Sequence, residues 1–95
     1  MLDEGANLTA VDRFGFSPLH IAVRAGQIEV ARLLLQYKAN VDARDLRGST
    51  PLHWAVRNND LVVSRLLADS GADVAAVDRY GNSVLHHLAR SAGPP

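Results

Sequence analysis

One motif recurs along the chain at a fixed spacing, and this periodicity constrains the fold more than any other feature. The stretch Asp45-Leu-Arg-Gly-Ser-Thr-Pro-Leu-His-Trp-Ala55 has a related copy that begins at Asp12 and a weaker copy that begins at Asp78. The starting points are 33 residues apart in both steps. A constant period of this length is typical of arrays in which one small unit packs on its neighbours. We therefore expect a stack of one repeated unit.

The first half of each unit predicts a tight hairpin turn followed by a short helix. The glycines at 15, 48 and 81 can adopt a positive φ, which favours a protruding turn at each copy. Ser17-Pro18 and Thr50-Pro51 each place a hydroxyl N-cap before a proline at the first helical position. We expect one helix from Pro18 to about Ala25 and a second from Pro51 to about residues 58–59.

The second half of each unit predicts a second, antiparallel helix. Residues 28–35 and 61–68 carry apolar side chains at helical spacing, with charged side chains on the opposite face. Asp60 is a suitable N-cap for the later helix, whereas Gln27 is a poor one for the earlier helix. Gly71 supplies a residue that can end a helix in the left-handed region. Lys38 occupies the same position in the earlier unit, where a left-handed residue with a side chain costs roughly 1 to 2 kcal/mol.

The register divides the chain into four segments. We expect residues 1–11 to be the end of a truncated repeat, residues 12–44 and 45–77 to be two full repeats, and residues 78–95 to be a partial repeat. The partial repeat has a hairpin turn and a first helix from Val84 to about Arg90, with no second helix after it. The interpretation is a piece cut from a longer array.

The period and the motif together resemble the ankyrin repeat. The resemblance rests on Thr50-Pro-Leu-His-Trp-Ala55, its variants that begin at Ser17 and Ser83, and the Ala-Asn-Val or Ala-Asp-Val turns after each second helix. Departures from the family pattern are Lys38 for glycine, Val84 for proline and Leu88 for alanine. The resemblance implies an all-α ankyrin-repeat solenoid of stacked helix-turn-helix units with β-hairpin fingers. It also implies a protein-binding scaffold that uses the fingers and first helices as a concave face.

Composition narrows the possible functions. The chain has no cysteine, no apolar run long enough to span a membrane and no secretory signal, so we expect an intracellular protein, cytoplasmic or nuclear. Ten basic and ten acidic residues give zero formal charge, which disfavours nucleic-acid binding. No phosphate-binding glycine loop or catalytic motif is present, so we expect neither enzymatic activity nor a cofactor.

The histidines of the motif are the residues most easily mistaken for metal ligands. His20, His53 and His86 lie on successive layers, which are too far apart to share one ion. We expect each ring to bond the motif hydroxyl or a nearby backbone group, so that the turn is fixed to the helix. The serine or threonine three residues earlier is then a helix cap and not a nucleophile, and no metal site is predicted.

The variable positions of the concave face, carried over from the family, are rich in arginine and free of acidic residues. The predicted partner-binding residues are Arg13, Phe14, Phe16, Arg24, Arg44, Leu46, Arg47, Arg57, Asn58, Arg79, Tyr80, Asn82 and Arg90. Ala25, Ser49, Val77 and Ser91 belong to the same set of positions, and Leu46, Arg47 and Ser49 are expected to be free to bind. Arginine and aromatic residues are frequent hot spots, so this face predicts an acidic protein partner with apolar anchors. The competing interpretation is that these arginines only keep the surface soluble.

Trp54 and the ends of the array leave two further questions open. Trp54 aligns with Ile21 and His87 within the first helix, and we expect it to be mostly buried in a packing role. The half repeats at both ends predict uncapped apolar faces, which could mediate self-association or stacking on other parts of a longer chain. Nucleic-acid binding through the arginines is a third and weaker hypothesis.

Overall fold

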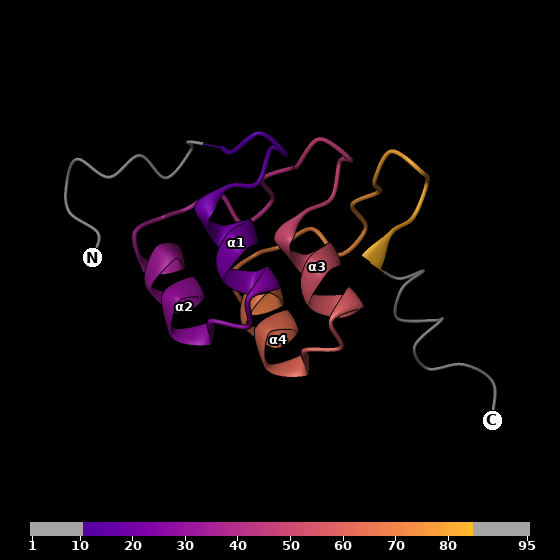
Figure 1. Ribbon diagram of the computed structural model, residues 1–95. Coiled ribbons are helices and arrows are strands. Elements are labelled where there is room, and N and C mark those ends of the chain that lie inside the picture. The colour runs from indigo at the N-terminus through magenta and orange to yellow at the C-terminus, as the bar shows by residue number, and fades with distance from the viewer. Residues whose placement is uncertain (1–10, 85–95) are drawn as a thin grey trace, which may run out of the picture.

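Four helices form the part of the chain that the structure, a computed structural model, describes, namely residues 11–84 (Figure 1). They are α1 (Pro18–Arg24), α2 (Ile28–Gln36), α3 (Pro51–Arg57) and α4 (Leu61–Asp69). Within each pair, three residues connect the first helix to the second, which runs back alongside it. The two helices expected in each full repeat are therefore present. The described part of the predicted third-repeat helix consists of Val84 alone.

The start of each first helix is fixed by its own sequence. The Ser17 and Thr50 side chains accept hydrogen bonds from the backbone N–H groups of His20 and His53, and a proline follows each cap. Asp60 caps α4 by accepting from the Val63 N–H at 3.1 Å, whereas Gln27 makes no side-chain cap at the start of α2. These contacts confirm the predicted starts, because each cap satisfies an N–H that the helix itself leaves free.

Each helix ends at a residue with positive φ, as the sequence predicts. Gly26 and Gly71 adopt φ values of 71° and 96°, while Lys38 and Asn59 adopt 64° and 56°. After each of these residues the next backbone N–H returns to a carbonyl in the last turn of the helix, for example from Ala39 to Leu34 at 3.0 Å. Lys38 thus takes the left-handed conformation expected from its place in the repeat.

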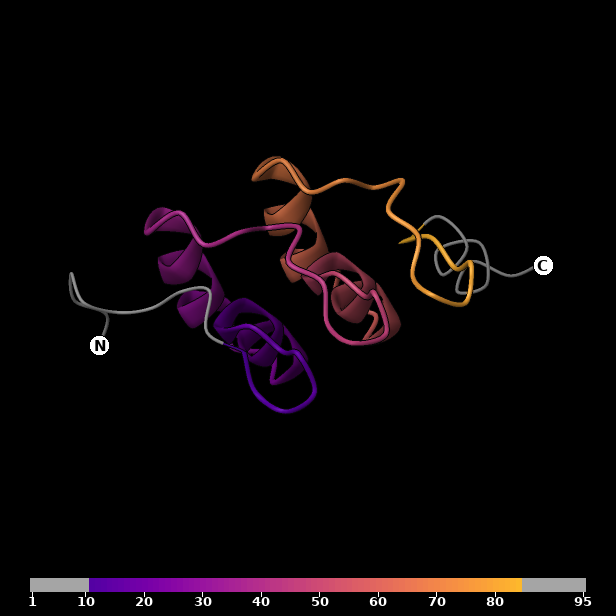
Figure 2. The same cartoon turned by 90° about the horizontal axis from the view of Figure 1, so that it is seen from above.

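Helices of successive repeats pack side by side in two rows. α1 packs against α3 and α2 against α4, and Figure 2 shows the α1/α3 row separated from the α2/α4 row. Both rows contribute to one apolar core between them. Its buried members are Leu19, Ala22, Val23, Ala31, Leu34, Leu52, Ala55, Val56, Val63, Leu67 and Val84. Small residues such as Ala22, Ala31 and Ala55 allow the short helices to approach closely, and packing of these faces supplies the stability that such short helices lack alone.

Three tight turns stand side by side above the first helices (Figure 1). Each is closed by a backbone hydrogen bond across its base, from the N–H of Asp12, Asp45 or Asp78 to the carbonyl four residues later. Within residues 11–84 they contain no extended strand pair, and the one isolated antiparallel bridge joins Val77 to Ser83. The fingers in the described region are hairpin turns with very little ladder.

Neighbouring turns are joined by backbone hydrogen bonds that require glycine. Leu46 N–H donates to the Phe14 carbonyl at 3.1 Å, and Arg79 N–H donates to the Arg47 carbonyl at 2.9 Å. A Cβ at Gly15, where φ is 78°, would lie 2.8 Å from the Leu46 nitrogen. Glycine at this position therefore allows both the backbone conformation of the first turn and the close approach of the second.

Candidate functional site

The predicted partner-binding residues lie on the turns and at the ends of the first helices. Arg90 falls outside the described residues, as does Ser91. Of the twelve other predicted partner-binding residues, Phe16 and Asn82 are half-buried, and the remaining ten are exposed. Phe14, Leu46 and Tyr80 keep 56%, 60% and 70% of their surface exposed, which leaves three large apolar side chains on this side of the molecule.

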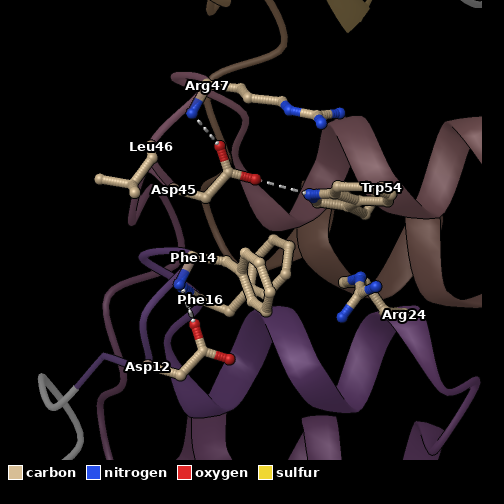
Figure 3. A pocket seen from close by; sticks show the side chains of 8 residues that line it. All are labelled: Asp12, Phe14, Phe16, Arg24, Asp45, Leu46, Arg47 and Trp54. Atoms are coloured by element: carbon tan, nitrogen blue, oxygen red, sulfur yellow. Dashed lines mark hydrogen bonds between the residues drawn. The ribbon is translucent and has the colours of Figure 1, made fainter.

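A cleft of about 440 Å³ lies at the junction between the first and second repeats. We call it the junction cleft. Figure 3 shows its lining, with the Phe14 and Phe16 rings on one side and Trp54 and Arg47 on the other. Its volume lies within the range of small-ligand and side-chain pockets. The residues that line it are Asp12, Phe14, Phe16, Arg24, Asp45, Leu46, Arg47 and Trp54.

Aromatic rings form the apolar part of the junction cleft. The Phe14 and Phe16 ring centroids are 5.8 Å apart, and the Phe16 and Trp54 rings meet edge to face at 5.7 Å. Both distances are typical of favourable aromatic pairs. The side chains come from the first turn and from α3, so the cleft exists because two successive repeats are stacked.

Trp54 is mostly buried and packs against the core, as expected, but it is also a residue of the site. The part of its side chain that stays exposed lines the junction cleft. Its indole Nε1–H donates to Asp45 Oδ2 at 3.0 Å. The indole is amphipathic, so its polar edge is satisfied at the surface while its apolar body contacts the core. Sequence reasoning missed this site residue because repeat alignment with Ile21 suggested an interior position.

Arg24 lies against two aromatic rings at the edge of the cleft. Its guanidinium carbon lies 4.2 Å from the Phe16 ring centroid and 5.0 Å from that of Trp54. Among residues 11–84, the Arg24 guanidinium makes no hydrogen bond or ion pair. The N–H donors of Arg24 that point away from the rings are therefore able to bind an acceptor.

Arg57 and Arg44 are held by the protein itself. Arg57 donates to Asp78 Oδ2 at 3.3 Å and also lies 4.9 Å from the Trp54 ring centroid. Arg44 donates to the carbonyls of Gly48 and Val77 at 3.0 and 2.7 Å, and so joins the second turn to the segment before the third. Both residues are exposed at the predicted face, but their guanidinium groups also have structural roles.

The aspartates at the start of the three turns fold the backbone around their carboxylates. Asp12 Oδ1 accepts the N–H groups of Phe14 and Phe16 at 2.9 and 3.0 Å, and Asp45 and Asp78 accept the equivalent groups in their turns. Burial alone would raise the pKa of Asp78. The N–H groups of Asn82 and Tyr80, with His53 and Arg57, outweigh that effect and hold the pKa of Asp78 below its usual value.

Ser49 is not free to bind, contrary to the prediction. It is fully buried, its N–H donates to Asp45 Oδ1 at 2.9 Å, and its carbonyl accepts from His20 Nε2 at 2.8 Å. The equivalent position in the first repeat is Phe16, which is half-buried beneath Arg24. This position of the turn therefore faces inward, and in the second repeat its carbonyl accepts a hydrogen bond from the histidine of the preceding repeat.

The motif histidines tie each repeat to the next. His20 Nδ1 lies 2.9 Å from Ser17 Oγ and accepts the Ser17 N–H at 3.1 Å, while His20 Nε2 contacts the Ser49 carbonyl. His53 repeats the pattern with Thr50 and with the Asn82 carbonyl at 3.1 Å. A carbonyl only accepts, so Nε2 carries the proton, and because Nδ1 accepts a backbone N–H it carries none, so the ring is neutral. The predicted bond to the motif hydroxyl is confirmed in both described copies.

Burial sets the charge state of both histidines. Desolvation lowers the pKa of His20 and of His53, and the backbone hydrogen bonds to Ser49 and Asn82 oppose it only in part. The Ser17–His20 pair has the separation of a nucleophile and its base. However, both side chains are buried and the far ring nitrogen already contacts a carbonyl, so the pair is closed to a substrate.

Between residues 11 and 84, no three His, Cys, Asp or Glu side chains come together as a group that could hold a metal ion. Within the same range, no helix has the length and apolar character that crossing a membrane requires.

Comparison with known proteins agrees with this architecture. A family model described as ankyrin repeats (3 copies) matches residues 1–78 and 39–94. A search of curated proteins finds no match to this chain. Ankyrin repeats are generally protein-interaction modules. The matched segments together span nearly the whole sequence and include both helix pairs, so the chain belongs to the ankyrin-repeat family.

Proposed function

We propose that this chain is a non-catalytic protein-interaction module, a section of an ankyrin-repeat solenoid with full repeats at 12–44 and 45–77. Its concave face, formed by the turns and first helices, binds a protein partner that is acidic and carries apolar anchors. The observation that carries the proposal is the junction cleft, where exposed aromatic and aliphatic side chains lie beside an arginine without a carboxylate partner among the described residues.

The distribution of charge supports an acidic partner. Ten basic and ten acidic residues give the chain no formal net charge, so an excess of one sign on this face is balanced elsewhere. The aspartates of the turns direct carboxylate oxygens at backbone N–H groups, whereas the arginines extend from the surface. Six arginines against three aspartates give this face a positive excess, which favours association with acidic surfaces. The arginines are Arg13, Arg24, Arg44, Arg47, Arg57 and Arg79.

Exposed apolar side chains next to these arginines support a role for apolar anchors. The guanidinium carbon of Arg13 lies 5.7 Å from the Phe14 ring centroid. Leu46 and Tyr80 have larger exposed fractions than Phe14. Arginine and aromatic residues provide most of the binding energy in many protein interfaces. A face that combines the two types is suited to a partner segment in which acidic and bulky apolar residues are interspersed.

Charge reversal on two faces tests this function. The variant Arg24→Glu/Arg47→Glu changes the junction cleft, and the matched control Arg32→Glu/Arg65→Glu changes two exposed arginines on α2 and α4. Proteins captured from a cell lysate by the chain should be lost with the first variant and retained with the second, while circular dichroism shows equal helicity. Equal capture by both variants would contradict the proposed face.

A second candidate function, assembly through the ends of the array, is favoured by the outward side of the first helix pair. Ile21, Val30 and Leu33 keep 47%, 45% and 38% of their surface exposed, and with Pro18 they line an apolar cleft. Val63, which occupies the register of Val30 one repeat later, is 1% exposed. Sedimentation at rising concentration tests self-association: a monomer throughout rejects it, and a Val30→Lys variant should abolish any dimer.

A further inference from the structure

The aspartate at the start of the turn accepts a side-chain hydrogen bond from a different type of residue at each of the two repeat junctions. Asp45 and Asp78 occupy equivalent positions in successive turns. Asp78 Oδ2 accepts from Arg57, the arginine at the end of the preceding first helix. Asp45 Oδ2 instead accepts from Trp54 Nε1. Arg24, the counterpart of Arg57, has no carboxylate partner in the described part of the chain.

The aromatic rings hold the Arg24 guanidinium in position. Its guanidinium carbon lies 4.2 Å from the Phe16 ring centroid and 5.0 Å from that of Trp54, and a cation is attracted to both rings at these distances. The N–H groups that point away from the rings remain able to donate two parallel hydrogen bonds to a carboxylate. A cation that is already oriented loses less side-chain entropy when it binds its ligand.

We infer that the junction cleft is the specificity site of the concave face, and that it takes an acidic residue next to a bulky apolar residue of a partner peptide segment. The partner's carboxylate binds Arg24, and the apolar side chain lies between Phe14 and Trp54. This inference rests on the proposed function and assigns its anchor point to one junction of the array.

The hydrogen-bond acceptors of the cleft already have partners, whereas the donors of Arg24 do not, and this favours an acidic ligand over a basic one. Asp45 already accepts hydrogen bonds from the N–H groups of Arg47 and Ser49 and from Trp54, and Asp12 accepts two backbone N–H groups. A ligand cation would have to compete with Arg24 for the rings and with these donors for the carboxylates. A ligand carboxylate meets an arginine whose donors are not satisfied within the described chain.

The apolar walls of the cleft select a bulky neighbour for that carboxylate. Phe14 is 56% exposed and Leu46 is 60% exposed, and the cleft beside them, about 440 Å³, is wide enough to admit one large side chain. Burial of an aromatic or branched aliphatic group there removes apolar area from water on both partners. An acidic peptide without such a group would make only the ion pair, which is weak at an exposed site.

Selection from a random twelve-residue peptide library displayed on phage tests the ligand chemistry. Selection on the full chain should enrich sequences with Asp or Glu within two residues of Phe, Leu, Ile or Met. Replacing the acidic residue by its amide, or the apolar residue by alanine, in a synthetic consensus peptide should each weaken binding at least about tenfold. Enrichment of basic or uncharged sequences, or failure to enrich any sequence, would overturn the inference.

Single variants then locate the site and separate this inference from the general function. Arg24→Gln should weaken binding of the consensus peptide at least about tenfold, and that loss should not add to the loss from the peptide amide substitution. Arg32→Gln, on α2, should leave binding unchanged. If Arg79→Gln weakens binding of an acidic peptide and Arg24→Gln does not, the cleft assignment fails while the concave-face function stands. If neither variant weakens it, both proposals fail.

Discussion

Lys38 adopts a backbone conformation that lowers the stability of the fold. It ends α2 with φ of 64° and is exposed, in a conformation that costs a residue with a Cβ roughly 1 to 2 kcal/mol. Lys38→Gly should raise the free energy of unfolding by up to about 1 kcal/mol, because glycine adopts this region freely but loses more entropy on folding. Urea titration of both proteins measures the difference.

The control for this prediction is Lys38→Ala, which removes the charge but keeps the Cβ. It should show little of the stabilisation that glycine gives. A Lys38→Gly protein that is less stable than the parent would show that the lysine side chain makes a larger contribution than its backbone strain.

At the residue scale, local chemistry explains what the sequence could predict. Lys38 and Thr50 act through their own backbone or the next few residues, so the motif alone identifies their roles. Trp54 depends on Asp45, nine positions earlier, and on Arg24 from the preceding repeat. Ser49 depends on His20, twenty-nine positions earlier. Such partners follow from the stacking geometry, which the repeat pattern does not specify in detail.

The turns and first helices form a connected element through the buried histidines. His20 and His53 each join the cap of their own helix to the turn of the next repeat, and both are fully buried and neutral. Because burial lowers the pKa of each ring in the folded state, the unfolded chain binds protons more readily, with an ordinary histidine pKa of about 6.5. Stability is therefore complete above that pH and declines as the pH falls through it.

The free energy of unfolding in urea should accordingly be lower at pH 5.5 than at pH 7.5. Protonation at Nδ1 would bring two donors face to face, because Nδ1 now accepts the N–H of Ser17 or Thr50. It would also place a charge in a buried position, which is unfavourable. Asp78 does not contribute in this interval, since the stability from its low pKa is lost only as the pH falls toward 4. Equal or greater stability at pH 5.5 would contradict the assigned charge state.

A His20→Asn variant serves as the matched comparison for this pH effect. The variant lacks one of the two described buried rings, so its stability should fall less steeply between pH 7.5 and 5.5, even though it starts from a lower value. An unchanged slope would assign the pH dependence to groups other than the histidine that joins the first and second repeats.

For the whole molecule, the repeat period predicted the arrangement of elements better than it predicted the working surface. Two pairs of short helices, their caps and their left-handed ends follow from hydrophobic spacing and from Gly, Pro, Ser and Thr positions. The positions of the arginines on the turns and helix ends come from the register of the repeat, and their role in binding stays a prediction. Which aspartate oxygen each side chain contacts was not predictable from the repeat: Asp78 accepts from Arg57, whereas Asp45 accepts from Trp54 and Arg24 lies against the aromatic rings.

Site-specific photo-crosslinking tests most directly the central claim that a partner docks at the junction cleft. A photoreactive amino acid would replace Leu46, which is exposed at the cleft, and in a matched protein Leu61, which is 70% exposed on α4. Irradiation in a cell lysate, followed by mass spectrometry, should give a protein adduct from position 46, mapped to a segment with adjacent acidic and bulky apolar residues, and none from position 61. An adduct from position 61 alone, or one from position 46 that maps to a basic segment, would contradict the account.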